Sequence, residues 1–331
     1  MLETPVALFI FNRPEETART FDAIRGARPR KLFIIADGPR YPEEIPLCEA
    51  TRAVTEHIDW SCEVKRNYTP INMGCDPRVS SGISWVFMHV DRAIFLEDDC
   101  VADGSFFTFC QELLDRYTND TRILLIGGTS CQEKNPDYKA TASYYFSMMS
   151  MGWGAYGTWR RAWSQYDWDM KRWPSLRDSG ELKRIFDNPA AYERFARVWD
   201  EYYEEKIHHT WDGPWSFVQA INGGLCANPV INLVENIGFN ERASHQKVNH
   251  PGWVDLPSKH MTFPLVHPST VTRDRAAENF DFLFFFGIDK TSWQRMIRPI
   301  KNRFPTLHHF AKALRTKIRT VLLARKEKNQ S

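Results

Sequence analysis

Short β-branched and apolar runs alternate with longer amphipathic stretches over the first 130 residues, and this alternation restricts the fold more than any other feature of the sequence. Such a pattern is typical of βαβ units, in which successive strands join one parallel sheet. Strands are predicted at residues 5–11, 31–36, 63–67, 92–96 and 123–126, and helices at residues 15–25 and 79–90. The chain is therefore predicted to have an α/β fold.

Polar side chains follow the ends of these predicted strands. Asn12 and Asp37 close the first two runs, Asn72 lies beyond the third, and residues 97–99 follow the fourth directly. Open α/β sheets bind ligands outside the carboxyl ends of their parallel strands. We therefore expect these side chains to share one ligand-binding edge of the sheet.

The acidic triplet Glu97, Asp98 and Asp99 comes directly after the apolar run Ile94–Leu96. Three successive carboxylates repel one another, so they destabilise a strand end unless a cation or hydrogen-bond donors meet them. Mg²⁺ or Mn²⁺ together with a diphosphate would suit them, because these ions bind through one or two carboxylates and substrate phosphate oxygens. The alternative is a solvated acidic turn.

Residues 5–24, 34–39 and 93–117 resemble the nucleotide-sugar domain of inverting GT-A glycosyltransferases, especially N-acetylglucosaminyltransferase I and related bacterial sugar transferases. The resemblance extends over roughly residues 5–245. It implies a GT-A fold, with a mostly parallel central sheet flanked by helices. It also implies that Asp99 holds the metal ion, Mn²⁺ or Mg²⁺, and that Glu97 and Asp98 contact the sugar nucleotide.

A second motif, Thr210–Trp215, resembles the family's aromatic-Asp-Asp-Trp segment, whose first aspartate is the catalytic base. Asp212 aligns with that base, whereas Gly213 replaces the second acid. The neighbouring tryptophans would partly desolvate Asp212 and raise its pKa, which improves a base. The alternative for Asp212 is a helix N-cap, because Asp is favoured before a helix that starts at Pro214.

Further residues are predicted to bind the sugar nucleotide. The resemblance implies base and ribose recognition by Asn12, Arg13 and Asp37, with Asp37 hydrogen-bonded to a uracil imide, although all three also suit turns. Arg78 could pair with the diphosphate or only decorate a helix surface. His245 could reach the metal ion or the diphosphate, or be an ordinary surface or core histidine.

Tryptophans are concentrated in the second half of the chain, from about residue 143. Eight of the twelve are Trp153, Trp159, Trp163, Trp168, Trp173, Trp199, Trp211 and Trp215. Most should pack an aromatic-rich acceptor half, and Trp153 and Trp211 are the best candidates for acceptor contact. Residues 152–163 also resemble the family's glycine-aromatic strand that leads to an acceptor-side helix.

Taken together, these features predict a metal-dependent inverting glycosyltransferase. It would move a sugar from a nucleotide-sugar donor, a UDP-sugar by the resemblance, to a cell-surface glycan or a lipid-linked acceptor. One alternative is a nucleotidyltransferase, but residues 11–14 lack the glycine-rich phosphate loop expected after the first strand. The other is a non-catalytic glycan-binding or scaffold protein of the same fold. No nucleic-acid-binding module is visible.

The predicted organisation is a catalytic domain over residues 1–288 and an appended tail over residues 289–331. The domain is expected to comprise a nucleotide-sugar half (1–130), an acceptor half (143–245) and a wrapping loop (246–288). The tail has helical apolar spacing, and its twelve Lys and Arg against two acids give a charge of +10. Since the formal net charge of the chain is +2, residues 1–288 carry −8.

The tail is predicted to be a basic amphipathic helix that binds an anionic membrane surface; the alternative is a solvated C-terminus. No run reaches the ~18 apolar residues of a membrane-spanning helix. The seven cysteines form no CxxC pair, which fits a reducing compartment. The expected location is therefore cytoplasmic, peripheral at the inner face of the plasma membrane.

Removal of residues 289–331 is expected to release the protein from anionic vesicles, because each Lys or Arg near such a surface contributes about 1 kcal/mol. Co-sedimentation with vesicles measures the loss, and donor binding should be unchanged. Sedimentation of the truncated protein with the same vesicles would show that attachment lies elsewhere.

Overall fold

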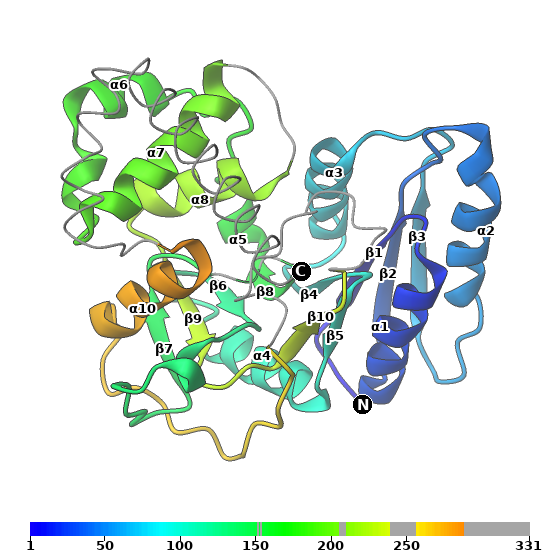
Figure 1. Ribbon diagram of the computed structural model, residues 1–331. Helices are drawn as coiled ribbons and strands as arrows, with labels where there is room; N and C mark the ends of the chain where they lie inside the picture. The colour runs from blue at the N-terminus through cyan, green and yellow to red at the C-terminus, as the bar shows by residue number, and fades with distance from the viewer. Residues whose placement is uncertain (151, 153, 205–209, 239–255, 288–331) are drawn as a thin grey trace, which may run out of the picture. The chain divides into compact units, whose positions relative to one another are not determined.

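The computed structural model describes residues 1–150, 152, 154–204, 210–238 and 256–287 (Figure 1). Trp153, His245 and the tail, residues 289–331, lie outside the described residues. The described residues up to Phe286 form one compact unit.

In the part of the chain that the structure describes, eight strands form the main sheet, in the order β3-β2-β1-β4-β8-β6-β9-β7. Their bounds are β1 Val6–Ile10, β2 Lys31–Ala36, β3 Glu63–Tyr68, β4 Arg92–Glu97, β6 Ile123–Gly127, β7 Tyr144–Ser147, β8 Ala155–Trp159 and β9 Leu225–Pro229. Within the described residues, β8 and β7 run antiparallel to their neighbours and the other six strands share one direction. The predicted α/β class, with a mostly parallel central sheet, is confirmed.

Helices flank both faces of the sheet (Figure 1). They are α1 Pro14–Ala27, α2 Ile45–Val54, α3 Cys75–Phe87, α4 Gly104–Arg116, α5 Arg160–Trp163, α6 Trp173–Ser179, α7 Pro189–Glu204, α8 Asp212–Ile221 and α10 Arg275–Phe286, with short 3₁₀ turns η1 Pro42–Glu44, η2 Gln132–Lys134 and η3 Leu182–Arg184. The predicted helix at 79–90 begins four residues earlier, at Cys75, directly after Gly74, whose φ of 85° suits glycine. This earlier start places Asp76 in the first turn of α3.

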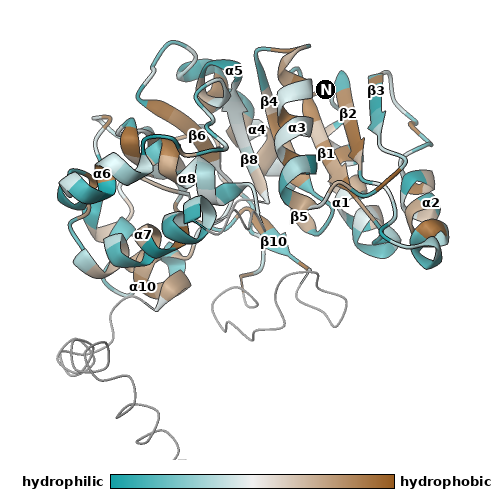
Figure 2. Ribbon diagram, turned by 90° about the horizontal axis from the view of Figure 1, so that it is seen from above, coloured by the Kyte–Doolittle hydropathy of each residue, from teal (hydrophilic) through white to brown (hydrophobic). Residues whose placement is uncertain are grey.

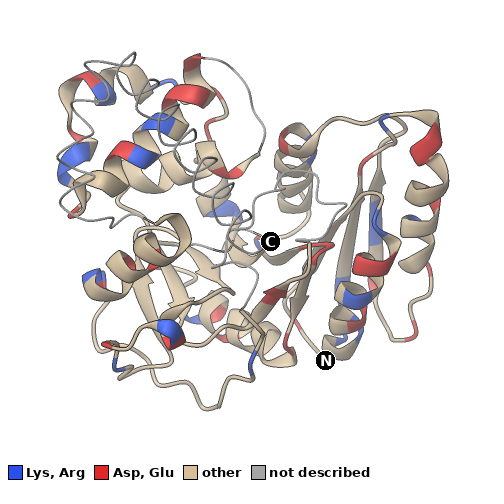
Figure 3. Cartoon of the chain, in the orientation of Figure 1, with Lys and Arg blue, Asp and Glu red and all other residues tan. Residues whose placement is uncertain are grey.

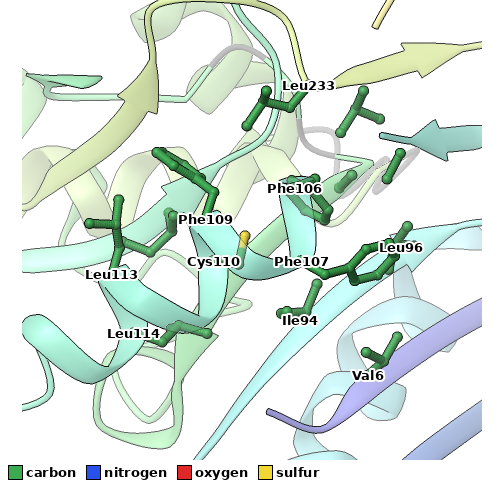
Figure 4. Close-up of a cluster of buried hydrophobic side chains, with 14 of the residues drawn as sticks. Val6, Ile94, Leu96, Phe106, Phe107, Phe109, Cys110, Leu113, Leu114 and Leu233 are labelled. Carbon is green, nitrogen blue, oxygen red and sulfur yellow. The ribbon is translucent and has the colours of Figure 1, made fainter. Parts of the chain in front are cut away.

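Alternation along the strands divides the core into two layers. Val6, Leu8 and Ile10 of β1 pack with residues of α1 and α4 on one face. Ala7 and Phe9 pack on the other face with residues of α3 and α8. Figure 4 shows part of the first layer, where Phe106 and Phe107 lie near Leu96 and Ile94. Because both faces are covered, the central strands are apolar throughout, as their mostly brown colour in Figure 2 shows.

A small second sheet was not predicted. β5, Cys100–Ala102, pairs antiparallel with β10, Val234–Asn236, so that Asn236 lies opposite Cys100. Three-residue strands leave almost no periodic signal in a sequence. The pairing brings residues 236–238 next to the acidic triplet.

The second half of the chain packs its tryptophans as predicted. Of the seven that are described there, six are buried, and Trp168 is half-buried. Trp173 and Trp199 meet edge to face with their ring centroids 5.1 Å apart. These rings are a core rather than a sugar-binding surface.

The expectation of a wrapping loop up to residue 288 was wrong for its last part, because α10 covers Arg275–Phe286. Two buried acids interrupt its apolar pattern. Asp281 accepts hydrogen bonds from Gln132 Nε2 at 2.7 Å and from the Tyr145 hydroxyl at 2.7 Å, and Glu278 accepts one from the Met148 N–H at 2.7 Å. Within the described part of the chain, no helix is long and apolar enough to cross a membrane.

Candidate active site at the carboxyl ends of the strands

The loops after β1, β2 and β4 converge at one edge of the sheet. The Phe11 N–H lies 3.3 Å from Asp98 Oδ2, and Arg13 contacts both Asp98 and Asp99. In Figure 3 the turn that follows β4 is red among mostly tan strands. The structure therefore brings together the first and fourth strand ends, as the sequence indicated.

Arg13 supplies the positive charge that the acidic triplet requires. Its Nη1 lies 2.8 Å from Asp99 Oδ2, and its Nη2 is hydrogen-bonded to Asp98 Oδ1. Burial lowers the pKa of Arg13, but the Asp98 and Asp99 carboxylates outweigh this and raise it overall. Burial raises the pKa of Asp98 to about 6, although Arg13 lowers it. These charge-assisted bonds hold the guanidinium across both acids.

Asp99 is enclosed by the segment that follows β10. The Ile237 N–H donates to the Asp99 carbonyl at 2.8 Å. A Cβ at Gly238 would lie 2.0 Å from Asp99 Oδ2, so any side chain at this position would force the Asp99 carboxylate to move.

Glu97 points to the opposite face of the sheet, toward α3 and α8. The Trp211 indole N–H donates to its Oε1 at 3.4 Å. Burial, and then the Asp99 carboxylate, raise the pKa of Glu97 to about 8. Trp211 itself is only 2% exposed and packs against Tyr156 with ring centroids 5.4 Å apart. Its predicted role as an acceptor-stacking face does not match this burial, since the ring is covered by core side chains.

Asp212 is the first residue of α8, and Trp211 rather than Asp212 takes the N-cap position. A carboxylate in the first turn interacts favourably with the helix dipole. Burial, followed by the charges of Glu97 and Asp212, raises the pKa of the Cys75 thiol. One thiol thus lies within electrostatic range of both the triplet and the predicted base.

Steric crowding explains why position 213 is a glycine rather than the second acid of the family motif. A Cβ at this position would lie 2.5 Å from the Tyr202 ring. The Tyr202 hydroxyl donates to the Thr210 carbonyl at 2.7 Å, which fixes the ring there. The second acid of the family motif therefore has no room in this chain.

Asp76 is the site residue that sequence reasoning missed. It is fully buried in the first turn of α3. Burial, and then the charge of Asp212, raise its pKa to about 7. With the helix predicted to begin at residue 79, Asp76 fell in a loop and gave no periodic signal.

Asp37 and Arg78 both form hydrogen bonds with other residues of the protein. The Asp37 carboxylate accepts hydrogen bonds from the N–H groups of Gly38, Met73 and Gly74, the Thr69 hydroxyl and the Asn72 amide. Buried Arg78 donates to the Ala36 carbonyl at 3.2 Å and to Asn67 Oδ1 at 3.0 Å. The contacts of Asp37 are those of a residue that stabilises a turn, which was the alternative to nucleotide binding in the sequence analysis. Together with those of Arg78, they hold the loops after β2 and β3 together.

Asn12 lies at the outer side of the same edge. Its amide donates to Glu44 Oε1 at 3.0 Å, and Glu44 is also paired with Arg40. The Arg40 guanidinium lies over the Phe11 ring, 5.2 Å from the ring centroid. The loop after β2 thereby closes onto the loop after β1.

No group of three His, Cys, Asp or Glu side chains is arranged to hold a metal ion in the described part of the chain. Mg²⁺ and Mn²⁺ do not require one, because substrate phosphates complete their coordination. The Asp99 carboxylate has the right donor chemistry, and Arg13 now holds one of its oxygens. The Asp99 carboxylate would hold such a cation, and the phosphates of a substrate would supply its other ligands.

No protein-family model and no curated protein sequence matches the chain. Among solved structures it is similar to the galactosyltransferase LgtC in complex with donor and acceptor sugar analogues, at 11% identity and a TM-score of 0.36, over 87% of this chain and 97% of that one. It is also similar to S. aureus TarS 1–349, at 8% identity and a TM-score of 0.38, over 70% and 59%. A UDP-glucose pyrophosphorylase complexed with UDP-glucose matches at 9% identity and a TM-score of 0.26, over 49% and 71%. These similarities are remote, so only the residues of the site can carry a functional argument.

Replacement of Arg13 by Met is expected to destabilise the protein by about 3–5 kcal/mol, because it leaves the buried Asp98 carboxylate without its partner. The pKa of Asp98, already raised, should rise further in the variant. A raised folded-state pKa stabilises the folded protein as pH falls, so the loss should be largest near pH 8.5 and smaller at pH 5.5. Urea unfolding at both pH values measures it.

Arg30→Met is the matched control, since Arg30 and Glu3 form an ion pair that is exposed on both sides. It should change stability by about 1 kcal/mol or less at either pH. Equal effects of the two substitutions would contradict the role given to Arg13.

Proposed function

We propose that the protein is an inverting GT-A glycosyltransferase that moves a sugar from a nucleotide-sugar donor, a UDP-sugar, to a glycan or lipid-linked acceptor. The observation that carries this proposal is the connection between two acidic centres. Glu97 of the strand-end triplet is hydrogen-bonded to Trp211, and Trp211 directly precedes Asp212. A diphosphate-binding edge and a base are thus joined through one buried side chain.

The proposed reaction needs one base and a counter-charge for the leaving group. Asp212 takes the proton of the acceptor hydroxyl while the acceptor oxygen forms a bond to the anomeric carbon. The bond between the anomeric carbon and the diphosphate oxygen breaks, and the diphosphate leaves with the electron pair. Arg13, which lies at this edge beside Asp98 and Asp99, would stabilise the developing negative charge.

We further propose that Mn²⁺ or Mg²⁺ is the cofactor, with Asp99 as its ligand from the described residues. When bound, such an ion stabilises the charge of the leaving diphosphate. His245 stays a predicted second ligand. Asn12, Asp98 and Glu97 stay predicted contacts of the sugar nucleotide.

For Asp37 and Arg78, the hydrogen bonds within the chain support a role in shaping the loops around the nucleotide. Direct contact of either residue with the donor stays a prediction. Trp153 stays a predicted acceptor contact. Attachment to an anionic membrane stays a proposal that rests on the +10 charge of residues 289–331.

Replacement of Asp212 by Asn is expected to lower sugar transfer by about 10²–10⁴-fold, because the base is lost, while donor affinity changes little. Release of nucleoside diphosphate from a UDP-sugar measures the effect. Asp169→Asn, which alters an exposed acid in the same half of the chain, is the control and should leave the rate of diphosphate release unchanged. Near-normal release by the Asp212 variant would exclude it as the base.

A thermal-shift panel of sugar nucleotides with Mn²⁺ should identify the donor, because a ligand at 100 times its Kd stabilises the folded state by about 2.7 kcal/mol. The shift should disappear in Asp99→Ala and persist in Asp115→Ala, a change at an exposed acid. A shift produced only by a nucleoside triphosphate with a sugar phosphate would favour a nucleotidyltransferase. Donor binding without metal-dependent release would favour a non-catalytic sugar-binding protein.

A further inference from the structure

Helix α10 arranges its acidic and apolar side chains in the reverse of the order that a surface helix normally has. Its two acids, Glu278 and Asp281, are 3% and 1% exposed, whereas Leu283 is 38% exposed and Phe280 and Phe284 are partly exposed. A helix that faces water normally turns apolar residues inward and charged residues outward. Contact with water alone therefore does not explain the outer side of α10.

Buried hydrogen bonds fix which side of α10 faces outward. Asp281 accepts from Gln132 Nε2 at 2.7 Å and from the Tyr145 hydroxyl at 2.7 Å. Glu278 accepts from the Met148 N–H at 2.7 Å. A rotation of α10 that hid its exposed apolar residues would break these bonds and bury polar groups without partners, which costs free energy. The exposed side is thus set by the packing of the helix.

Three residues form the outer face of α10: Phe280, Leu283 and Phe284. Their spacing of i, i+3 and i+4 makes them neighbours on the helix surface. The rings of Phe280 and Phe284 stack with their centroids 5.9 Å apart. None of the exposed residues of the helix is acidic; they are Arg275, Ala276, Asn279 and Leu283. The outer face is therefore an apolar surface without negative charge.

The sequence that follows α10 indicates what this surface contacts. The helix ends at Phe286, and residues 289–331 carry twelve Lys and Arg against two acids, a charge of +10. An anionic surface that attracts this segment is thereby held close to the outer face, because only two residues separate the two parts of the chain. Helices that lie in a membrane interface combine Phe or Leu with Lys and Arg in this way, and their affinity increases with the apolar area buried and with the attraction to anionic lipids.

We propose that the outer face of α10 inserts into the interface of an anionic lipid bilayer, next to the headgroups that residues 289–331 bind. The inference rests on the membrane attachment proposed above and adds a second, apolar contact to it. The inward position of Glu278 and Asp281 keeps their charge away from the anionic headgroups. Since the Asp274 N–H before α10 donates to the Phe146 carbonyl of β7 at 2.7 Å, insertion would place the β7 edge of the sheet beside the bilayer.

Co-sedimentation of the full chain with vesicles of phosphatidylcholine and phosphatidylglycerol tests the inference. The double variant Phe280→Gln, Leu283→Gln should bind these vesicles about tenfold more weakly than the wild type, or less, because burial of Leu or Phe side chains supplies that much. Met88→Gln is the matched control, since Met88 is 70% exposed at the end of another helix, α3, and it should bind as the wild type does. Leu283→Phe, which keeps an apolar side chain, should also bind normally.

Salt separates the apolar contact from the attraction of the basic residues. At about 1 M NaCl the Debye length is about 3 Å, so binding through residues 289–331 should weaken equally in the wild type and the double variant. The apolar contribution is not screened, and the ratio of the two affinities should therefore stay at about ten. Near-UV circular dichroism checks that each variant is folded. Release of nucleoside diphosphate without vesicles should be the same in the wild type and the double variant, since the outer face takes no part in the reaction.

The outcomes distinguish the inference from the attachment on which it rests. Equal vesicle binding by the wild type and the double variant, with loss of binding on removal of residues 289–331, would overturn the inference and leave attachment through the basic residues. Absence of binding by the wild type would refute both. A wild type that is dimeric in analytical ultracentrifugation, with a monomeric double variant that still binds vesicles, would assign the outer face to a second copy of the chain and also overturn the inference.

Discussion

Repulsion among the carboxylates at the end of β4 is the constraint on which the rest of the site depends. A buried parallel strand delivers Glu97, Asp98 and Asp99 to one edge of the sheet, where water cannot screen them fully. The chain resolves this by separating them. Arg13 contacts Asp98 and Asp99 on the α1 side, while Glu97 lies on the other face, where the Trp211 indole N–H donates to it. The triplet is thus two half-sites rather than one acidic patch.

This division explains why the surroundings of the two half-sites differ. On the Arg13 side, the close approach of Gly238 to Asp99 and the pairing of β10 with β5 leave little free space around a charged pair. On the Glu97 side, beside the packed rings of Tyr156 and Trp211, burial raises the pKa of the carboxyl more than the charge of Arg13 lowers it. The proposed reaction needs charge near a diphosphate and basicity near an acceptor hydroxyl, and in the proposal the two faces of one strand would supply them separately.

The sequence predicted what depends on local pattern. Strands β1 to β4, strand β6 and the fold class follow from the alternation of apolar runs with amphipathic stretches. Strand β3 is charged because it lies at the sheet edge, where polar residues protect against edge-to-edge pairing. The convergence of Arg13 with the triplet follows from strand direction alone. Contacts between distant segments could not be predicted from the sequence. The β5–β10 pairing and the Asp76–Asp212 proximity depend on how helices and short strands pack, and no single segment of the sequence indicates this packing. Burial of Trp211 was missed for the same reason, since composition cannot tell a sugar-stacking ring from a core ring.

The replacement of the second acid at position 213 and the presence of Asp76 have a common physical explanation. The Tyr202 ring occupies the space that a side chain at position 213 would need, so a carboxyl cannot lie there. The first turn of α3 places another carboxyl, that of Asp76, within electrostatic range of Asp212. A carboxyl at position 213 would share the backbone of Asp212, whereas Asp76 belongs to an independent helix that packs against β1 and β2. Because the two acids are held by separate elements, no single segment of the sequence indicates that they lie close together.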